Sequence, residues 1–136
     1  MPDDLRLTAA EALALAQRLI DEGRPFHAHE VFEAVWKSCP EEERPLWKGL
    51  AQIAVGLTHA LRGNDRGAVT LLGRGTDAVD AYGGSRGGDS LPEGLDLMVV
   101  TVRVRALAER IERSGIKAVP EADFRLSLAR PHIAPP

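Results

Sequence analysis

The chain has 136 residues, 44% hydrophobic and 27% charged, with a formal net charge of −3, a composition ordinary for one globular domain and unlike that of a dedicated nucleic-acid binder. Its one cysteine, Cys39, cannot form an internal disulfide, which fits a reducing compartment. No signal peptide is visible at the first residues and no apolar run reaches the length of a membrane span, so we expect a cytoplasmic protein without a membrane partner.

Three helices are predicted in the first half of the chain, over residues 8–23, 25–39 and 45–63. A capping-box pattern of Thr8 and Glu11 begins the first helix. A proline fits the first turn of each of the other two, and glycines end the first and the third. Apolar residues recur at helical spacing in the first and third segments, which supports the prediction.

Two more helices are predicted in the second half, over residues 64–82 and 92–113, with a glycine-rich loop at 83–90 between them. The fourth begins with an asparagine, a favourable N-cap. Gly73 and Gly75 lie inside it and each costs about 1 kcal/mol relative to alanine, so we expect close packing against another helix there. In the fifth, apolar spacing favours a helix although several valines have β propensity.

These elements predict an all-α fold, a single-domain bundle of about five helices in residues 1–115. Several prolines in residues 116–136 predict an extended tail that lies over the bundle or over a partner. No internal repeat or second domain is visible. A protein partner or a homo-oligomer stays open, because nothing in the composition addresses it.

Three residues on one face of the second predicted helix suggest a site. His29, Glu33 and Trp36 fall within about 60° of arc, on a stripe that is otherwise apolar. Burying an imidazole and a carboxylate costs free energy unless each has a partner. His27 and Glu30 are predicted to project away from this stripe. The pattern therefore predicts a place for binding, although it defines no reaction and no catalytic residue.

The third predicted helix carries Gln52 and His59 on one side, together with two glycines that allow another helix to approach. If the second and third helices form an antiparallel hairpin, His29 and Glu33 face these two side chains. Two imidazoles and a carboxylate suit a divalent transition ion such as zinc, iron or manganese. The predicted metal ligands are His29, Glu33 and His59, with Gln52 as a supporting or substrate-binding group and Trp36 as the wall.

Several separated motifs resemble the domain-of-unknown-function family 309 over about residues 12–82. They are the run from Phe26 to Trp36, the run from Trp47 to Ala54, and His59 with Gly63-Asn64 and Gly67-Ala68. The family consists of small bacterial and archaeal proteins described as all-helical, and His29, Glu33 and Trp36 match its H-x-x-x-E-x-x-[WY] motif. The resemblance implies an all-helical fold and a motif suggested to bind metal. It implies no activity, because the family is uncharacterised.

Three functions from different classes fit these residues. The first is a metal-binding or metal-dependent protein that uses the ligands named above. The second is a noncatalytic interaction or structural module, in which His29 and Glu33 form a buried hydrogen-bond network that fixes the helix register. The third is a metal-free pocket for a small polar molecule, with Glu33 as a candidate general base.

Overall fold

The computed structural model describes residues 7–86 and 95–129. Within these two ranges the chain forms five α-helices and no β-strand, which confirms the predicted all-α class. The helices are α1 (Ala9–Asp21), α2 (Pro25–Ser38), α3 (Arg44–Leu61), α4 (Asp65–Arg86) and α5 (Leu97–Ser114). None of the described helices combines the length and the apolar character that crossing a membrane requires.

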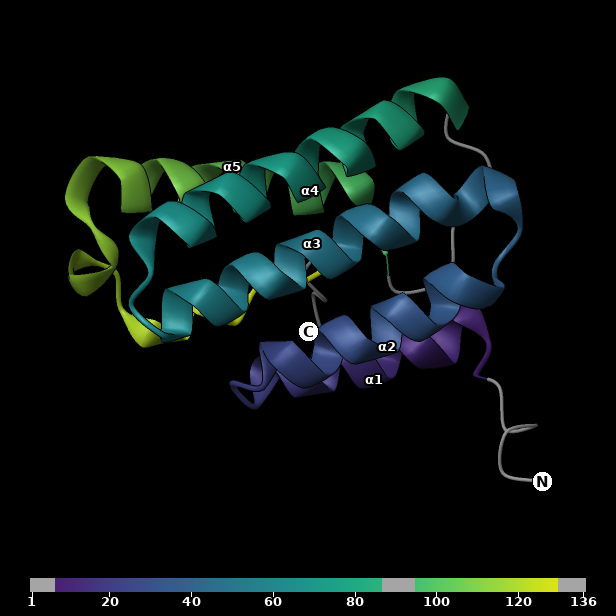
Figure 1. The fold of residues 1–136 in the computed structure, drawn as a ribbon, viewed down its shortest axis with the longest axis horizontal. Coiled ribbons are helices and arrows are strands. Elements are labelled where there is room, and N and C mark those ends of the chain that lie inside the picture. Colours follow the sequence, from purple (N-terminus) through teal and green to yellow (C-terminus); the bar gives the residue numbers. More distant parts are fainter. Residues whose placement is uncertain (1–6, 87–94, 130–136) are drawn as a thin grey trace, which may run out of the picture.

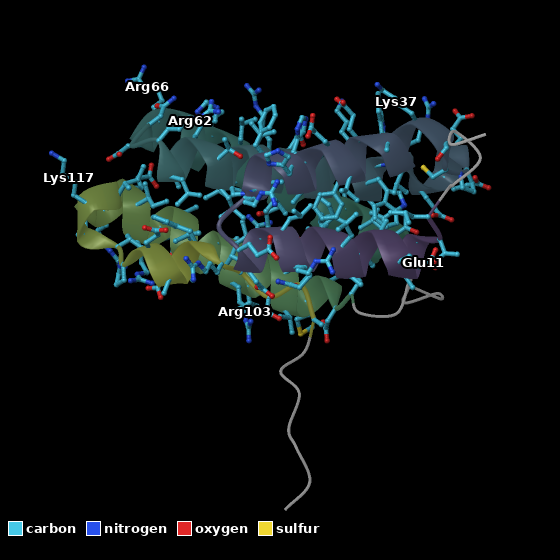
Figure 2. The ribbon with its side chains drawn as sticks, turned by 90° about the horizontal axis from the view of Figure 1, so that it is seen from below. Glu11, Lys37, Arg62, Arg66, Arg103 and Lys117 are labelled. Atoms are coloured by element: carbon cyan, nitrogen blue, oxygen red, sulfur yellow. The ribbon has the colours of Figure 1, made fainter. Side chains whose placement is uncertain are left out.

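Helix α3 is the centre of the bundle. It lies between α2 and α4, while α1 packs on the far side of α2 and α5 packs on α4 (Figure 1). Its Trp47 is fully buried and packs near the ring of Phe32 from α2. The buried indole N–H of Trp47 donates to Glu43 Oε1 over 3.2 Å, so that burying this large side chain leaves no unpaired donor. Charged side chains project outward, Arg62 and Arg66 at one end of the molecule and Lys37 at the other (Figure 2).

Local signals set the ends of the first three helices. The predicted capping box is confirmed, because the Thr8 N–H donates to Glu11 Oε1 over 2.8 Å and the Glu11 N–H donates to Thr8 Oγ1 over 3.1 Å. Gly23 and Gly63 have φ angles of +76° and +79°, which side chains disfavour, and they end α1 and α3. The Asn64 side chain accepts a hydrogen bond from a backbone N–H in the first turn of α4 and confirms the predicted N-cap.

Helix α4 extends four residues further than predicted, to Arg86 instead of residue 82. The predicted loop at 83–90 is therefore wrong in its first half, and its residues 87–90 lie outside the described residues. The reason is packing: a Cβ on Gly83 would lie 3.1 Å from Leu97 Cδ1 of α5. The glycine lets α4 continue against α5, and this tertiary contact outweighs the low helix propensity of the segment.

Helix α5 begins later than predicted, at Leu97, whereas the sequence indicated a start at Pro92. Asp96 is its N-cap, and the Asp96 carboxylate accepts a hydrogen bond from the Val99 N–H over 3.1 Å. Aspartate at this position satisfies an N–H of the first turn, which a proline does not. Leu95, just before the cap, is buried.

After α5, the chain folds back over the bundle. Residues 116–129 contain two 3₁₀ turns, η3 (Ile116–Ala118) and η4 (Glu121–Phe124), so this part of the predicted tail is more compact than an extended strand. It buries four apolar side chains, those of Val119, Phe124, Leu126 and Leu128. Their burial gives a physical reason for the segment to stay on the bundle. Residues 130–136 of the predicted tail lie outside the described residues.

The side-chain amide of Gln17 on α1 holds this segment in place. Gln17 Nε2 donates to the Leu126 carbonyl over 2.8 Å, and the Leu128 N–H donates to Gln17 Oε1 over 2.7 Å. The Leu128 carbonyl in turn accepts a hydrogen bond from the Asp96 N–H over 2.9 Å. These bonds satisfy backbone groups that have no helix or strand partner.

Candidate functional site

The polar stripe of α2 borders a groove of about 240 Å³ between α2 and α3, which we call the α2–α3 groove. His29, Glu33 and Trp36 line it from α2, and Gln52 lines it from α3. The apolar part of the lining consists of Ala51, Val55 and Leu71. The lining also contains the cationic side chain of Lys48. The structure thus brings together four of the five side chains selected from the sequence.

His29 and Glu33 do not form a buried hydrogen-bond network. The distance from His29 Nε2 to Glu33 Oε2 is 3.8 Å, beyond hydrogen-bond range, and the other Glu33 oxygen lies 3.9 Å from Lys37 Nζ. The side chain of His29 is 21% exposed and that of Glu33 is 45% exposed. The predicted burial of Glu33 is therefore wrong. Ion pairs this exposed contribute about 0–1 kcal/mol, so the pair is available to a ligand at small cost.

One nitrogen of His29 is unsatisfied. Its Nδ1 atom is buried and has no hydrogen-bond partner within the protein, unlike the other buried side-chain nitrogens and oxygens of the described residues. The Phe26 ring, centred 5.4 Å from the imidazole, packs beside it. This environment favours the tautomer that carries its hydrogen on Nε2, which faces Glu33. An unpaired buried polar atom costs about 1–3 kcal/mol, and a protein fold retains few of them.

Trp36 is held on one side by a cation. The Arg44 guanidinium lies 5.2 Å from the centre of the Trp36 ring, a cation–π contact that contributes about 0.5–1 kcal/mol at an exposed site. Trp36 is half-buried and borders the α2–α3 groove. Its role as a wall of a binding site stays a prediction.

His59 lies outside the α2–α3 groove, in the last turn of α3. The side-chain amide of Asn64 donates to His59 Nδ1 over 2.9 Å. A Cβ on Gly67 would lie only 2.8 Å from the same nitrogen, so the missing side chain makes room for the imidazole. The local cap of α4 therefore engages the His59 ring.

The groove residues do not form a metal site held by protein side chains alone. Across residues 7–86 and 95–129, no group of three or more histidine, cysteine, aspartate or glutamate side chains is placed to hold a metal ion. His29 and Glu33 supply two ligands, and His59 does not join them. Zinc sites in proteins use three or four protein ligands.

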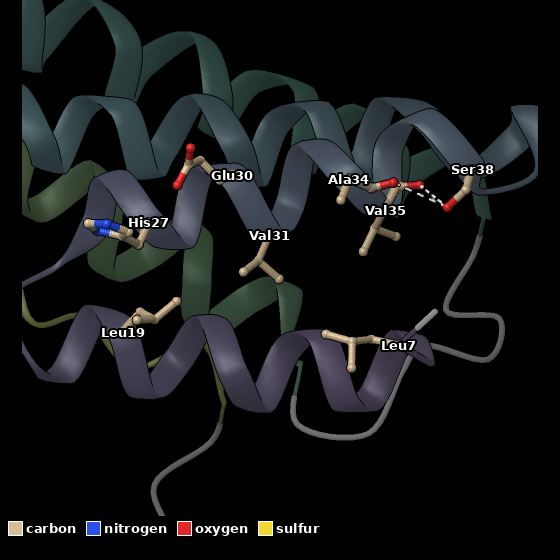
Figure 3. Close-up of a pocket in the computed structure, with 8 residues that line it drawn as sticks. All are labelled: Leu7, Leu19, His27, Glu30, Val31, Ala34, Val35 and Ser38. Atoms are coloured by element: carbon tan, nitrogen blue, oxygen red, sulfur yellow. Dashed lines mark hydrogen bonds between the residues drawn. The ribbon is translucent and has the colours of Figure 1, made fainter. Parts of the chain in front are cut away.

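A second hollow, of about 500 Å³, contains two residues that the sequence reasoning excluded. His27 and Glu30 line it at one end and Ser38 at the other, between α1 and α2 (Figure 3). Apolar side chains form the rest of its lining, namely Leu7, Leu19, Val31, Ala34 and Val35. The two residues project away from the α2–α3 groove, as predicted. The same 3.6-residue periodicity would have found this second stripe of α2, which faces α1.

Residues 13–71 match the profile of a family described as Domain of unknown function (DUF309). This segment belongs to the DUF309 family. The match confirms the resemblance, and the DUF309 segment contains the whole of α2 and α3 and every residue that lines the α2–α3 groove. It ends inside α4. A search of curated proteins and a search of solved structures found no match. The family description names no activity, so an assignment of function has to come from the groove itself.

Proposed function

We propose that the protein binds a small polar molecule in the α2–α3 groove. The observation that supports the proposal is the convergence of Glu33, His29, Gln52 and Trp36, which come from two helices and share one hollow with an apolar floor. Ligand sites in proteins combine a mostly apolar lining with a few polar groups that fix the orientation of the ligand.

The four side chains define what the ligand offers. The Glu33 carboxylate accepts hydrogen bonds, while the Gln52 amide both donates and accepts. The indole face of Trp36 covers an apolar or planar part of the ligand. A volume of about 240 Å³ is below the 300–1,000 Å³ of sites for drug-sized ligands, so the ligand is a small metabolite. We propose binding and assign no reaction, because the lining of the groove does not define one.

The first experiment is a thermal-shift screen of untagged full-length protein against small polar metabolites. A ligand present at 100 times its dissociation constant stabilises the folded state by about 2.7 kcal/mol. Glu33→Gln removes the charge that accepts the ligand's hydrogen bond, which costs about 1.5–3 kcal/mol and weakens binding by roughly 10–100-fold. The matched control is Glu112→Gln, on the exposed face of α5, which lines no part of the groove.

Two outcomes would contradict the proposal. One is a screen in which no compound stabilises the wild-type protein. The other is a stabilisation that Glu33→Gln and Gln52→Ala leave unchanged, since such a ligand binds elsewhere.

A transition ion is the competing occupant, and elemental analysis separates the two. Untagged wild-type protein and the Glu33→Gln variant are purified without chelator and measured side by side. We expect no stoichiometric zinc, iron or manganese in either protein, because only His29 and Glu33 in the groove are metal ligands of the usual types. Stoichiometric metal that is lost in Glu33→Gln would replace the small-molecule proposal with a metal site.

A further inference from the structure

A third hollow, distinct from the one between α1 and α2, adjoins the α2–α3 groove. It is an open depression of about 630 Å³ beside the beginning of α3 and the middle of α4, and we call it the α3–α4 hollow. Three of its lining residues, Trp36, Lys48 and Gln52, also line the α2–α3 groove. The two hollows are therefore adjacent, with Trp36, Lys48 and Gln52 between them.

Three cations line the α3–α4 hollow, namely Arg44, Lys48 and Arg74. None of them is within ion-pair distance of an acidic side chain in the described part of the chain. Two carboxylates also line the hollow. Of these, Asp77 lies 3.3 Å from Arg105 of α5, which it shares with Asp80, and Glu41 is the other. In a chain with a net charge of −3, the cations that line this hollow thus outnumber its carboxylates.

The three cations come from two helices. Arg44 and Lys48 are four residues apart on α3, hence on one face of that helix, and Arg74 reaches the hollow from α4. The cation–π contact with Trp36, 5.2 Å from the guanidinium to the centre of the ring, restrains Arg44 at the edge of the hollow. A guanidinium offers paired N–H donors that match the oxygens of a carboxylate or a phosphate, and an ammonium adds a point charge.

We infer that the ligand of the α2–α3 groove carries an anionic group, a phosphate or a carboxylate, which binds in the α3–α4 hollow between Arg44, Lys48 and Arg74. The inference rests on the proposed function, because it takes the two hollows as one site. The ligand then lies across Trp36, with a hydrogen-bond donor toward Glu33 and its anionic group toward Arg74.

A titration followed by NMR amide shifts tests the inference directly. The full-length protein receives inorganic phosphate or acetate, with sodium chloride at equal ionic strength as the reference. We expect saturable shifts at the backbone N–H groups of Arg44, of residues 46–48 and of residues 74–78, and at the Trp36 indole, which Trp36→Phe identifies. Tighter binding of phosphate than of acetate is expected from its larger charge and agrees with a phosphate group, whereas the reverse order identifies a carboxylate.

Arg74→Gln is the decisive variant, because Arg74 lines the α3–α4 hollow and not the α2–α3 groove. We expect it to weaken anion binding by at least tenfold. Arg113→Gln is the matched control on an exposed turn of α5 and leaves binding unchanged. Both variants replace exposed side chains, and a thermal melt confirms that each is folded. Shifts no larger than those with chloride, or equal weakening by the two variants, would overturn the inference.

The two proposals can fail separately. If a neutral metabolite binds in a Glu33-dependent way and the protein binds neither phosphate nor acetate, the proposed function is supported and the inference of an anionic group is overturned. Anion binding that depends on Arg74, in a protein that no metabolite stabilises through Glu33, supports the anion site and overturns the proposed function.

Discussion

Helices α3 and α4 touch backbone to backbone at two glycines. A Cβ on Gly75 would lie 2.5 Å from the Gly49 carbonyl oxygen and 2.9 Å from the Ile53 nitrogen, whereas a Cβ on Gly73 would have no neighbour within 4 Å. These two glycines are two residues apart on the same helix. Their substitution by alanine therefore separates intrinsic helix propensity from packing.

The two variants are expected to change stability in opposite directions. In Gly73→Ala the propensity gain acts alone and raises the free energy of unfolding by about 0.5–1 kcal/mol. In Gly75→Ala the same gain is opposed by overlap with backbone atoms, which cannot rotate away as a side chain can. Overpacking of this kind costs about 1–3 kcal/mol and occasionally more. The two variants should therefore differ by about 1–3 kcal/mol, with Gly75→Ala the less stable.

Urea denaturation followed by far-ultraviolet circular dichroism measures this difference. A change of 1 kcal/mol moves the thermal midpoint by about 2–8 °C for domains of this size range, so a thermal melt gives an independent reading. Gly49→Ala is a second variant of the same contact, since its Cβ would lie 2.9 Å from the Gly75 carbonyl oxygen. Equal midpoints for Gly73→Ala and Gly75→Ala would refute the packing argument.

Two further predictions follow from contacts outside the groove. Gln17→Ala leaves the Leu126 carbonyl and the Leu128 N–H without their partner, so we expect a loss of about 1–3 kcal/mol in unfolding free energy and faster hydrogen exchange at the Leu128 amide; unchanged exchange would show that the amide does not hold the segment. Burial and the nearby Glu43 carboxylate raise the pKa of the Cys39 thiol, so at mildly alkaline pH a smaller fraction of it is thiolate than in an unfolded chain. Iodoacetamide should therefore react more slowly with native protein than with urea-unfolded protein, and the difference should be larger at the lower pH values. Equal rates over that pH range would contradict the raised pKa.

The first three helices were predictable because their ends are encoded locally. The Thr8 capping box, the prolines at 25 and 45 and the glycines at 23 and 63 each act within one turn of the chain. The end of α4 and the start of α5 were not predictable in this way. At Gly83 the missing side chain leaves room for Leu97 of α5, and such a contact between helices leaves no local signal.

In the candidate site, too, the features that follow from local periodicity could be predicted and those that depend on tertiary packing could not. The joint placement of His29, Glu33 and Trp36 follows from helical periodicity, and the antiparallel packing of α2 and α3 adds Gln52. His59 has the right periodicity, but the Asn64 side chain in the following turn engages its ring. The position of Arg74 in the α3–α4 hollow could not be predicted, because an exposed arginine carries no periodic signal and reaches the hollow only through the packing of α4 on α3.

The contact between Gly49 and Gly75 also joins a residue inside the DUF309 match to a residue outside it. The DUF309 match ends at residue 71, so Gly49 lies inside it and Gly75 lies beyond it, in the same α4 helix. The segment that matches the family is thus shorter than the helix bundle that it packs in. A larger residue at position 75 would push α4 away from α3 and distort the α2–α3 groove. In related chains we therefore expect positions 49 and 75 to be coupled, with a small residue at both wherever α3 and α4 pack this closely.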